Sequence, residues 1–313
     1  MAGGRGADRE AVKGERPEGG EAPHAGGRHR RGIGGWSWLF LPAGLFLLFF
    51  FAVPMLYIFY LSFIQADDAG HALGYGLGNY LRFFSEAYYT GALWMTIKIS
   101  VATTLVALAL GYPVAMFLAA ASPRVRGVLT LLVVSPLLVS IVVRNFGLYL
   151  LLIPNGVINR LLEGLHLTAG PVKFLYAESG VVIGLANAYL PFMILSIATS
   201  LYNIDPSLKR ASAILGAGPV RTFWSITLPL SLPGVVAGVV LVFSMSMSSY
   251  VTPALLGGAN VPMLPVVAYD EILNLLRWTY GSAISYILLG TTLLLVTLFS
   301  RAMERGRFRE VFR

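Results

Sequence analysis

The sequence predicts an all-α integral membrane protein with six transmembrane helices and both termini on the cytoplasmic side. The 313 residues are 56% hydrophobic and only 12% charged, with a mean hydropathy of +0.72, whereas an ordinary soluble domain carries about 25% charged residues. Six stretches are long and apolar enough to cross a bilayer. The basic residues, which give a net charge of +8, cluster at the chain ends and in short connections.

Each span is predicted from its length, because a membrane-crossing helix needs about 20 consecutive apolar residues. Windows of that length with at most one charge lie at Trp36–Ile64, Trp94–Ala121, Gly127–Ile153, Gly180–Tyr202, Gly234–Leu256 and Gly281–Ser300. None of the six contains Asp or Glu. We interpret the first as a retained helix rather than a cleaved signal peptide, since it far exceeds an apolar signal region of about 7–15 residues.

The orientation follows from the basic residues. Seventeen of the 23 Lys and Arg residues lie before the first span, after the sixth, or in the connections that follow the second and fourth spans. Cytoplasmic loops carry such an excess, so these segments are predicted to be cytoplasmic. Residues 1–35 are rich in Gly and mixed charges and are expected to form a disordered tail that anchors topology or contacts anionic lipid. Residues 302–313 form a second, basic tail.

Several classes of function are disfavoured by composition. The chain has no cysteine, and its four histidines fall outside the apolar runs, so we expect no metal site and no bound cofactor. The basic charge lies where it sets membrane topology, so we expect contact with membrane lipid and not with nucleic acid. No Gly-x-x-x-x-Gly-Lys-Ser/Thr loop is present, and no nucleophile-and-base set appears in the spans, which disfavours an enzyme.

The connection between the fourth and fifth spans is predicted to form a helix, a break and a second helix. Asp205 is a plausible N-cap and Pro206 suits the first helical position. Small side chains at 211–213 give the helix a slim face, and Gly216 and Gly218 end it. A short helix with a face of small side chains can fit into a cleft on another protein.

This connection resembles a motif of the binding-protein-dependent ABC permeases. The family pattern is Glu-Ala-Ala, three residues, Gly, nine residues, Ile-x-Leu-Pro, and it docks in a cleft of the ATPase subunit. Here Arg210-Ala211-Ser212 is followed after three residues by Gly216 and after nine more by Ile226-Thr227-Leu228-Pro229. Arg210 replaces the usual Glu and Ser212 the second Ala. The resemblance places ATPase coupling in a loop at 203–229, on Asp205, Lys209, Arg210, Ala211, Ser212, Gly216, Ile226, Leu228 and Pro229.

The resemblance covers nearly all of Trp36–Arg301 and is closest to the spermidine/putrescine-type permeases and their opine-type relatives. It is carried by Gly78–Phe84, Leu110–Val114, Ser135-Pro136, Val143-Arg144 and Tyr250–Gly258. It implies a type I importer-like permease domain over 36–301 that forms half of a translocation path in the bacterial inner membrane. The implied partners are an ABC ATPase dimer that binds ATP and Mg, a second permease subunit and a periplasmic binding protein.

Candidate residues for the substrate path are the polar side chains within spans. Arg144, beside Asn145, is the one charge deep in a predicted span. It either contacts an anionic substrate group, snorkels to the interface or pairs with the partner permease. The hydroxyl-rich run Ser246, Ser248, Ser249 and Tyr250 either lines the path or packs helices. Asn187 and Tyr189 form a similar polar break, whereas Lys98 is expected to snorkel.

The substrate itself stays open. Polyamines carry two or more positive charges, yet no predicted span has a carboxylate, which favours a zwitterionic or carboxylate-bearing solute unless the partner permease supplies acidic groups. Polyamine, opine and amino-acid-like solutes all remain candidates. Asp270, Glu271 and Arg277 either meet a periplasmic binding protein or lie in a solvated loop. A rival function is a stand-alone secondary transporter or channel, although such proteins usually place Asp, Glu or His at mid-membrane.

Overall fold

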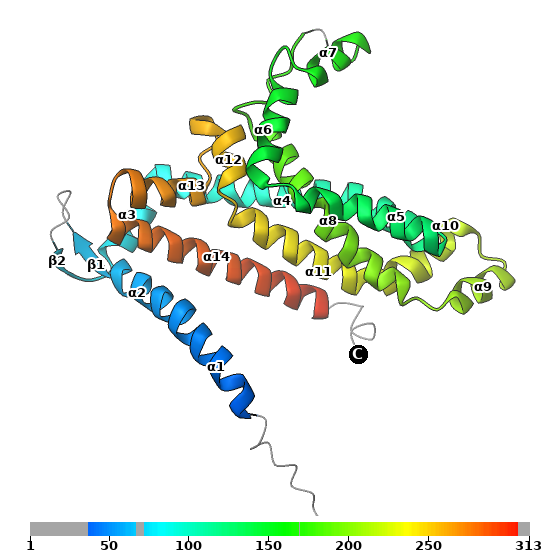
Figure 1. Ribbon diagram of the computed structural model, residues 1–313, viewed down its shortest axis with the longest axis horizontal. Helices are drawn as coiled ribbons and strands as arrows, with labels where there is room; N and C mark the ends of the chain where they lie inside the picture. Colours follow the sequence, from blue (N-terminus) through cyan, green and yellow to red (C-terminus); the bar gives the residue numbers. More distant parts are fainter. Residues whose placement is uncertain (1–36, 67–71, 169, 306–313) are drawn as a thin grey trace, which may run out of the picture. The chain divides into compact units, whose positions relative to one another are not determined.

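The structure is a computed structural model that describes residues 37–66, 72–168 and 170–305, and its regular structure is helical apart from one hairpin (Figure 1). The chain divides into two compact units, of which the first ends at Ala52 and the second begins at Val53. The first unit contains α1 (Ser37–Leu47) and the π-helix η1 (Leu48–Ala52). The expected tail at 1–35 lies outside the described residues. At the other end, α14 (Trp278–Arg305) extends into the expected tail at 302–313, and residues 306–313 lie outside the described part.

Six helical stretches of the described chain are long and apolar enough to cross a membrane, which confirms the predicted number. They are Leu41–Ser62, Ala87–Ala120, Ile141–Gly164, Glu178–Tyr202, Pro219–Met247 and Trp278–Met303. The first contains α1, η1 and α2 (Val53–Ser62); the second, fourth and sixth correspond to α4 (Ala87–Ala120), α8 (Glu178–Tyr202) and α14. The second begins seven residues earlier than predicted.

The third predicted span is not one continuous helix. The stretch Gly127–Ile153 divides into α5 (Pro123–Val134), a short 3-10 helix η2 (Ser135–Leu138) and α6 (Ile141–Leu152), followed by α7 (Val157–Gly164). Pro136 has no N–H to continue α5, and Ser140 has an extended ψ of 133°. The chain turns between α5 and α6, so α6 runs across the direction of α5 and packs against α12 (Figure 1).

The fifth predicted span, Gly234–Leu256, is shifted and broken. The helical stretch begins with α10 (Pro219–Thr222) and the π-helix η3 (Phe223–Thr227), continues as α11 (Leu228–Met247) and stops before α12 (Val251–Leu256). Ser248 donates its hydroxyl to the Ser244 carbonyl at 3.1 Å, and Pro253 fits only the first turn of a new helix. Residues 248–250 therefore form a break inside the predicted span.

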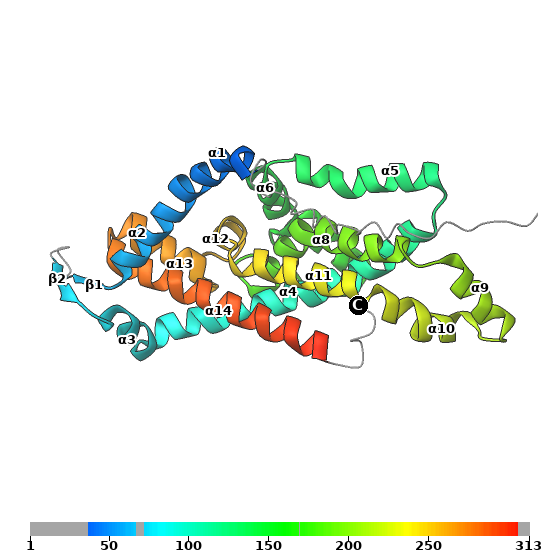
Figure 2. The same ribbon diagram turned by 90° about the horizontal axis from the view of Figure 1, so that it is seen from below.

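The end of the second unit opposite to α9 and α10 contains the remaining short elements (Figure 2). Strands β1 (Ile64–Ala66) and β2 (Ala72–Tyr75) pair antiparallel, and α3 (Gly78–Ser85) leads into α4. Asn79 donates to the carbonyls of Ser62 (3.0 Å) and Ile64 (2.8 Å), which fixes α3 to the end of α2. The 3-10 helix η4 (Gly258–Asn260), α13 (Leu264–Tyr269) and the π-helix η5 (Asp270–Asn274) connect α12 to α14.

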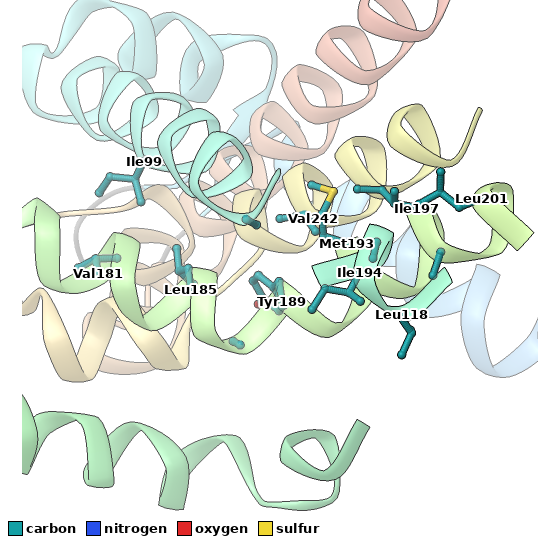
Figure 3. Packing of buried hydrophobic residues seen from close by; sticks show 14 of the residues in the cluster. Ile99, Leu118, Val181, Leu185, Tyr189, Met193, Ile194, Ile197, Leu201 and Val242 are labelled. Carbon is teal, nitrogen blue, oxygen red and sulfur yellow. The ribbon is translucent and has the colours of Figure 1, made fainter. Parts of the chain in front are cut away.

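The core lies where α4, α8 and α11 pack together (Figure 3). Of the most apolar 18 residues of each span, 61% are buried in α8, against 33% in α4 and 28% in the stretch with α11, so α8 is the central helix. Glycines permit its close contact with α11. A Cβ on Gly234 would lie 2.5 Å from the Ser196 carbonyl oxygen, and one on Gly238 would lie 2.7 Å from the sulfur of Met193. Small residues at such contacts are typical of membrane helix packing.

Candidate functional site

The connection between α8 and α11 has the helix, break, helix form that the sequence predicts. Helix α9 (Pro206–Ile214) begins with Pro206 at its first position, and the Asp205 side chain accepts a hydrogen bond from the Ser207 N–H at 2.8 Å. That bond holds the pKa of Asp205 below its usual value, because it stabilises the charged carboxylate. The predicted N-cap is confirmed.

The turn after α9 depends on Gly216. Its φ of +78° lies in the left-handed region, where a side chain is disfavoured. The Gly216 N–H donates to the Ala213 carbonyl and the Ala217 N–H to the Ser212 carbonyl, both at 3.0 Å. The hydroxyls of Ser212 and Thr222 then meet at 2.8 Å, which ties α9 to α10. Ser212, predicted as part of the slim face, is in fact the buried link within the loop.

The tip of this loop exposes large apolar side chains. Ile214 and Leu215 are 86% and 85% exposed, and Val220 is 70% exposed. Lys209 and Arg210 are also exposed, on α9. Contiguous exposed apolar side chains of this kind are typical of interaction surfaces.

The loop is continuous with the spans behind it. A hollow of about 440 Å³ is lined by residues from the ends of α4 and α8 and from α9, α10 and η3. Ile226 falls in η3, whereas Leu228 and Pro229 open α11. The second half of the predicted motif is therefore the start of the fifth span, and Tyr112 of α4 bonds to Ser231 of α11 at 2.8 Å just beyond it.

The polar residues proposed for the path gather where α6, α8 and the α11–α12 break meet. Arg144 and Asn187 line one hollow of about 350 Å³. The Tyr189 hydroxyl contacts Ser249 and lies near enough to Arg144 to feel its charge. Asn145, fully buried, donates to Thr252 of α12 at 3.0 Å. The sequence does not reveal Thr252 as part of this cluster, because a lone Thr in an apolar run carries no signal.

Three of the candidates lie apart from that cluster. Ser246 is fully buried within α11, and its hydroxyl has no partner among the described residues. Ser248 is exposed and bonds to its own helix. Tyr250 stacks on Tyr269 of α13 with ring centroids 4.3 Å apart.

Two charged residues have partners that the sequence does not reveal. The Nζ of Lys98, which is expected to snorkel, lies 2.7 Å from a carboxylate oxygen of Glu178 at the start of α8, and the pair joins α4 to α8. Glu271 is not in a solvated loop: it is 4% exposed and accepts a 2.7 Å hydrogen bond from the hydroxyl of Tyr89, with Arg277 3.9 Å away. Only the fold places Tyr89 beside Glu271, 182 residues along the chain.

The fold is that of a multi-span membrane protein, with an exposed α9–α10 loop at one end and a polar helix break among the spans. The family model for the inner-membrane component of binding-protein-dependent transport systems matches residues 111–309. The chain belongs to this family, and it is a multi-pass membrane protein.

Individual relatives agree with that assignment. The chain is 32% identical to the spermidine/putrescine transport system permease protein PotB of Haemophilus influenzae, over 82% of this chain and 90% of the relative. It is 33% identical to PotB of Escherichia coli, over 83% of this chain and 95% of the relative. A chain of a bacterial alginate ABC transporter, solved with an alginate-bound periplasmic protein, matches with a TM-score of 0.71 at 20% identity, covering 86% and 93% of the two chains. The fold is therefore that of a type I ABC importer permease.

Proposed function

We propose that this chain forms half of the translocation path of an ATP-driven importer, for a small polar solute of the polyamine group that a periplasmic binding protein delivers. The exposed α9–α10 loop carries the proposal. Its apolar tip, fixed by the Gly216 turn and the Ser212–Thr222 hydrogen bond, is shaped to enter a cleft on another protein. The partner is an ABC ATPase dimer that binds ATP and Mg, and the residues between Asp205 and Pro229 form the coupling surface.

Orientation is part of the same proposal. The α9–α10 loop and the two chain ends are among the segments in which the basic residues concentrate, so the loop and both termini face the cytoplasm. The hairpin, α3 and α13 then face the periplasm and the binding protein. The hollow behind the loop is lined by the ends of α4 and α8, so movement of the loop is transmitted directly to the spans.

The solute class rests on the PotB relatives, which match this chain over more than four-fifths of its length. A second subunit is part of the proposal, because the described part of this chain supplies six spans and Arg144 faces a hollow that is open. A related permease chain completes the path, and opine or amino-acid-like solutes are the next candidates.

The first experiment is to tag the chain, solubilise native membranes gently and identify the proteins that co-purify by mass spectrometry. Recovery of an ATPase subunit with a phosphate-binding loop, together with a second permease, supports the importer. A known importer from the same membranes serves as the control for gentle extraction. Recovery of the chain alone, while that control stays intact, would contradict the proposal and favour a secondary transporter or channel.

A further inference from the structure

Arg144 is a basic side chain in the spans whose charge has no acidic partner within residues 37–66, 72–168 and 170–305. Its Nη1 donates to the carbonyl of Pro136 at 3.0 Å, and its buried Nε has no partner in the same part of the chain. A guanidinium has five N–H donors, of which this bond uses one. Lys98, by comparison, has Glu178 at 2.7 Å. The uncompensated charge lies in a setting where an unpaired ion is costly.

The donors that remain for a ligand are at one end of the guanidinium. Nη1 donates to the Pro136 carbonyl and Nε is buried, which leaves Nη2 as the open nitrogen. An N–H group of a charged guanidinium forms a short, strong hydrogen bond to a carboxylate oxygen. The hollow beside Arg144 also exposes Asn187, whose amide can donate to the same group.

Neutral groups complete the surroundings. The Tyr189 hydroxyl contacts Ser249, and the Asn145 amide nitrogen donates to Thr252, so α8 and α6 are both joined to the α11–α12 break beside the hollow. The buried Oδ1 of Asn145 has no partner among the described residues. The rest of the lining is apolar or glycine: Pro136, Val139, Gly147, Leu148 and Leu151. A single cation in an apolar, open hollow attracts an anion strongly, because few competing charges screen it.

We infer that Arg144 and Asn187 form a binding site for one carboxylate group. The inference rests on the proposed function, which supplies two sources of that group: the transported solute, or an Asp or Glu of the second permease subunit. A carboxylate from the second subunit would reconcile the arginine with a polyamine solute. The solute's own carboxylate would instead make the substrate zwitterionic.

The natural absence of cysteine permits a direct test. Asn187→Cys is reacted, in the purified complex and in the chain separated from its partners, with a sulfonate-bearing and with a trimethylammonium-bearing methanethiosulfonate. The ratio of the two labelling rates is compared with that of Asn187→Cys combined with Arg144→Gln. Thr199→Cys, exposed on the same helix α8, is the matched control. This readout does not depend on transport, so it is separable from failure of the proposed function.

The expected result is a preference for the sulfonate reagent that falls about tenfold on Arg144→Gln and is absent at Thr199→Cys. Preference in the intact complex identifies the solute as the source of the carboxylate. Preference only after the partners are removed identifies the second permease as the source. An equal reagent ratio with and without Arg144 in both preparations would overturn the inference.

Discussion

Replacing Gly216 tests the docking loop most sharply, because the structure separates two effects of a side chain at that position. Its φ of +78° is unfavourable for residues with a Cβ, at a cost of roughly 1–2 kcal/mol. A Cβ there meets no atom within 4 Å, so no steric clash within the chain is added. Any loss beyond the backbone cost must come from a partner that covers the turn.

We therefore expect a graded series. Gly216→Asn should stay close to wild type in ATP-driven uptake, because Asn tolerates the left-handed conformation. Gly216→Ala should lose at most about 5–30-fold, the effect of roughly 1–2 kcal/mol. Gly216→Trp should lose at least about tenfold more than Gly216→Ala, because its ring would occupy the docking cleft. Gly164→Trp on α7, where a Cβ also meets no atom within 4 Å, is the control for bulk alone.

The assay is uptake into proteoliposomes that contain the whole complex and its binding protein, at equal membrane abundance, with ATP hydrolysis measured in parallel. Loss of uptake with retained basal hydrolysis marks uncoupling. Wild-type uptake by Gly216→Trp would show that the turn is not covered by a partner. Equal losses in Gly216→Ala and Gly216→Trp would show that backbone strain, not docking, explains the effect.

Three further predictions concern stability and pH. Tyr89→Phe leaves buried Glu271 without its 2.7 Å hydrogen bond and should lower the free energy of unfolding by about 1–3 kcal/mol. The loss is measured as a lower melting temperature in detergent and is compared with that of Tyr89→Phe combined with Glu271→Gln. Gly234→Val should separate α11 from α8 at the Ser196 carbonyl and cost roughly 1–3 kcal/mol; an unchanged melting temperature would contradict the packing. The pKa of Asp205 is lowered on folding, so its support of α9 is present above the unfolded-state pKa and is lost as pH falls through the folded value. The protection factors of the α9 amides, which correct for the intrinsic pH dependence of exchange, should therefore fall at acid pH in wild type and stay constant in Asp205→Asn.

The sequence predicts the loop well because its signals are local. An N-cap, a proline at the first helical position and a glycine at the turn each act within a few residues, and the structure contains all three at Asp205, Pro206 and Gly216. The number of spans is predicted for a similar reason, since length and hydropathy are properties of a continuous segment.

Contacts between distant segments are not readable in this way. Nothing in the sequence connects Tyr89 with Glu271, whose carboxylate accepts its hydroxyl in the fold, and Lys98 is isolated in the sequence although Glu178 neutralises it. The helix breaks are missed because hydropathy measures how apolar a segment is and not the direction in which the chain runs. A chain that turns at Pro136 is as apolar as one that continues straight.

The breaks at Pro136 and at residues 248–250 explain why Arg144, Asn187 and Tyr189 lie close together. Within a bilayer, non-helical backbone is tolerated only where protein covers it or where it lines a cavity. Arg144 binds the Pro136 carbonyl at the first break, and Tyr189 meets Ser249 at the second. The breaks expose backbone groups and bring polar side chains from α6, α8 and α12 to one region of an otherwise apolar bundle. The buried cluster of α4, α8 and α11 is apolar, and the Lys98–Glu178 pair lies at the exposed start of α8. The proposed function therefore places the path of a polar solute at the two breaks.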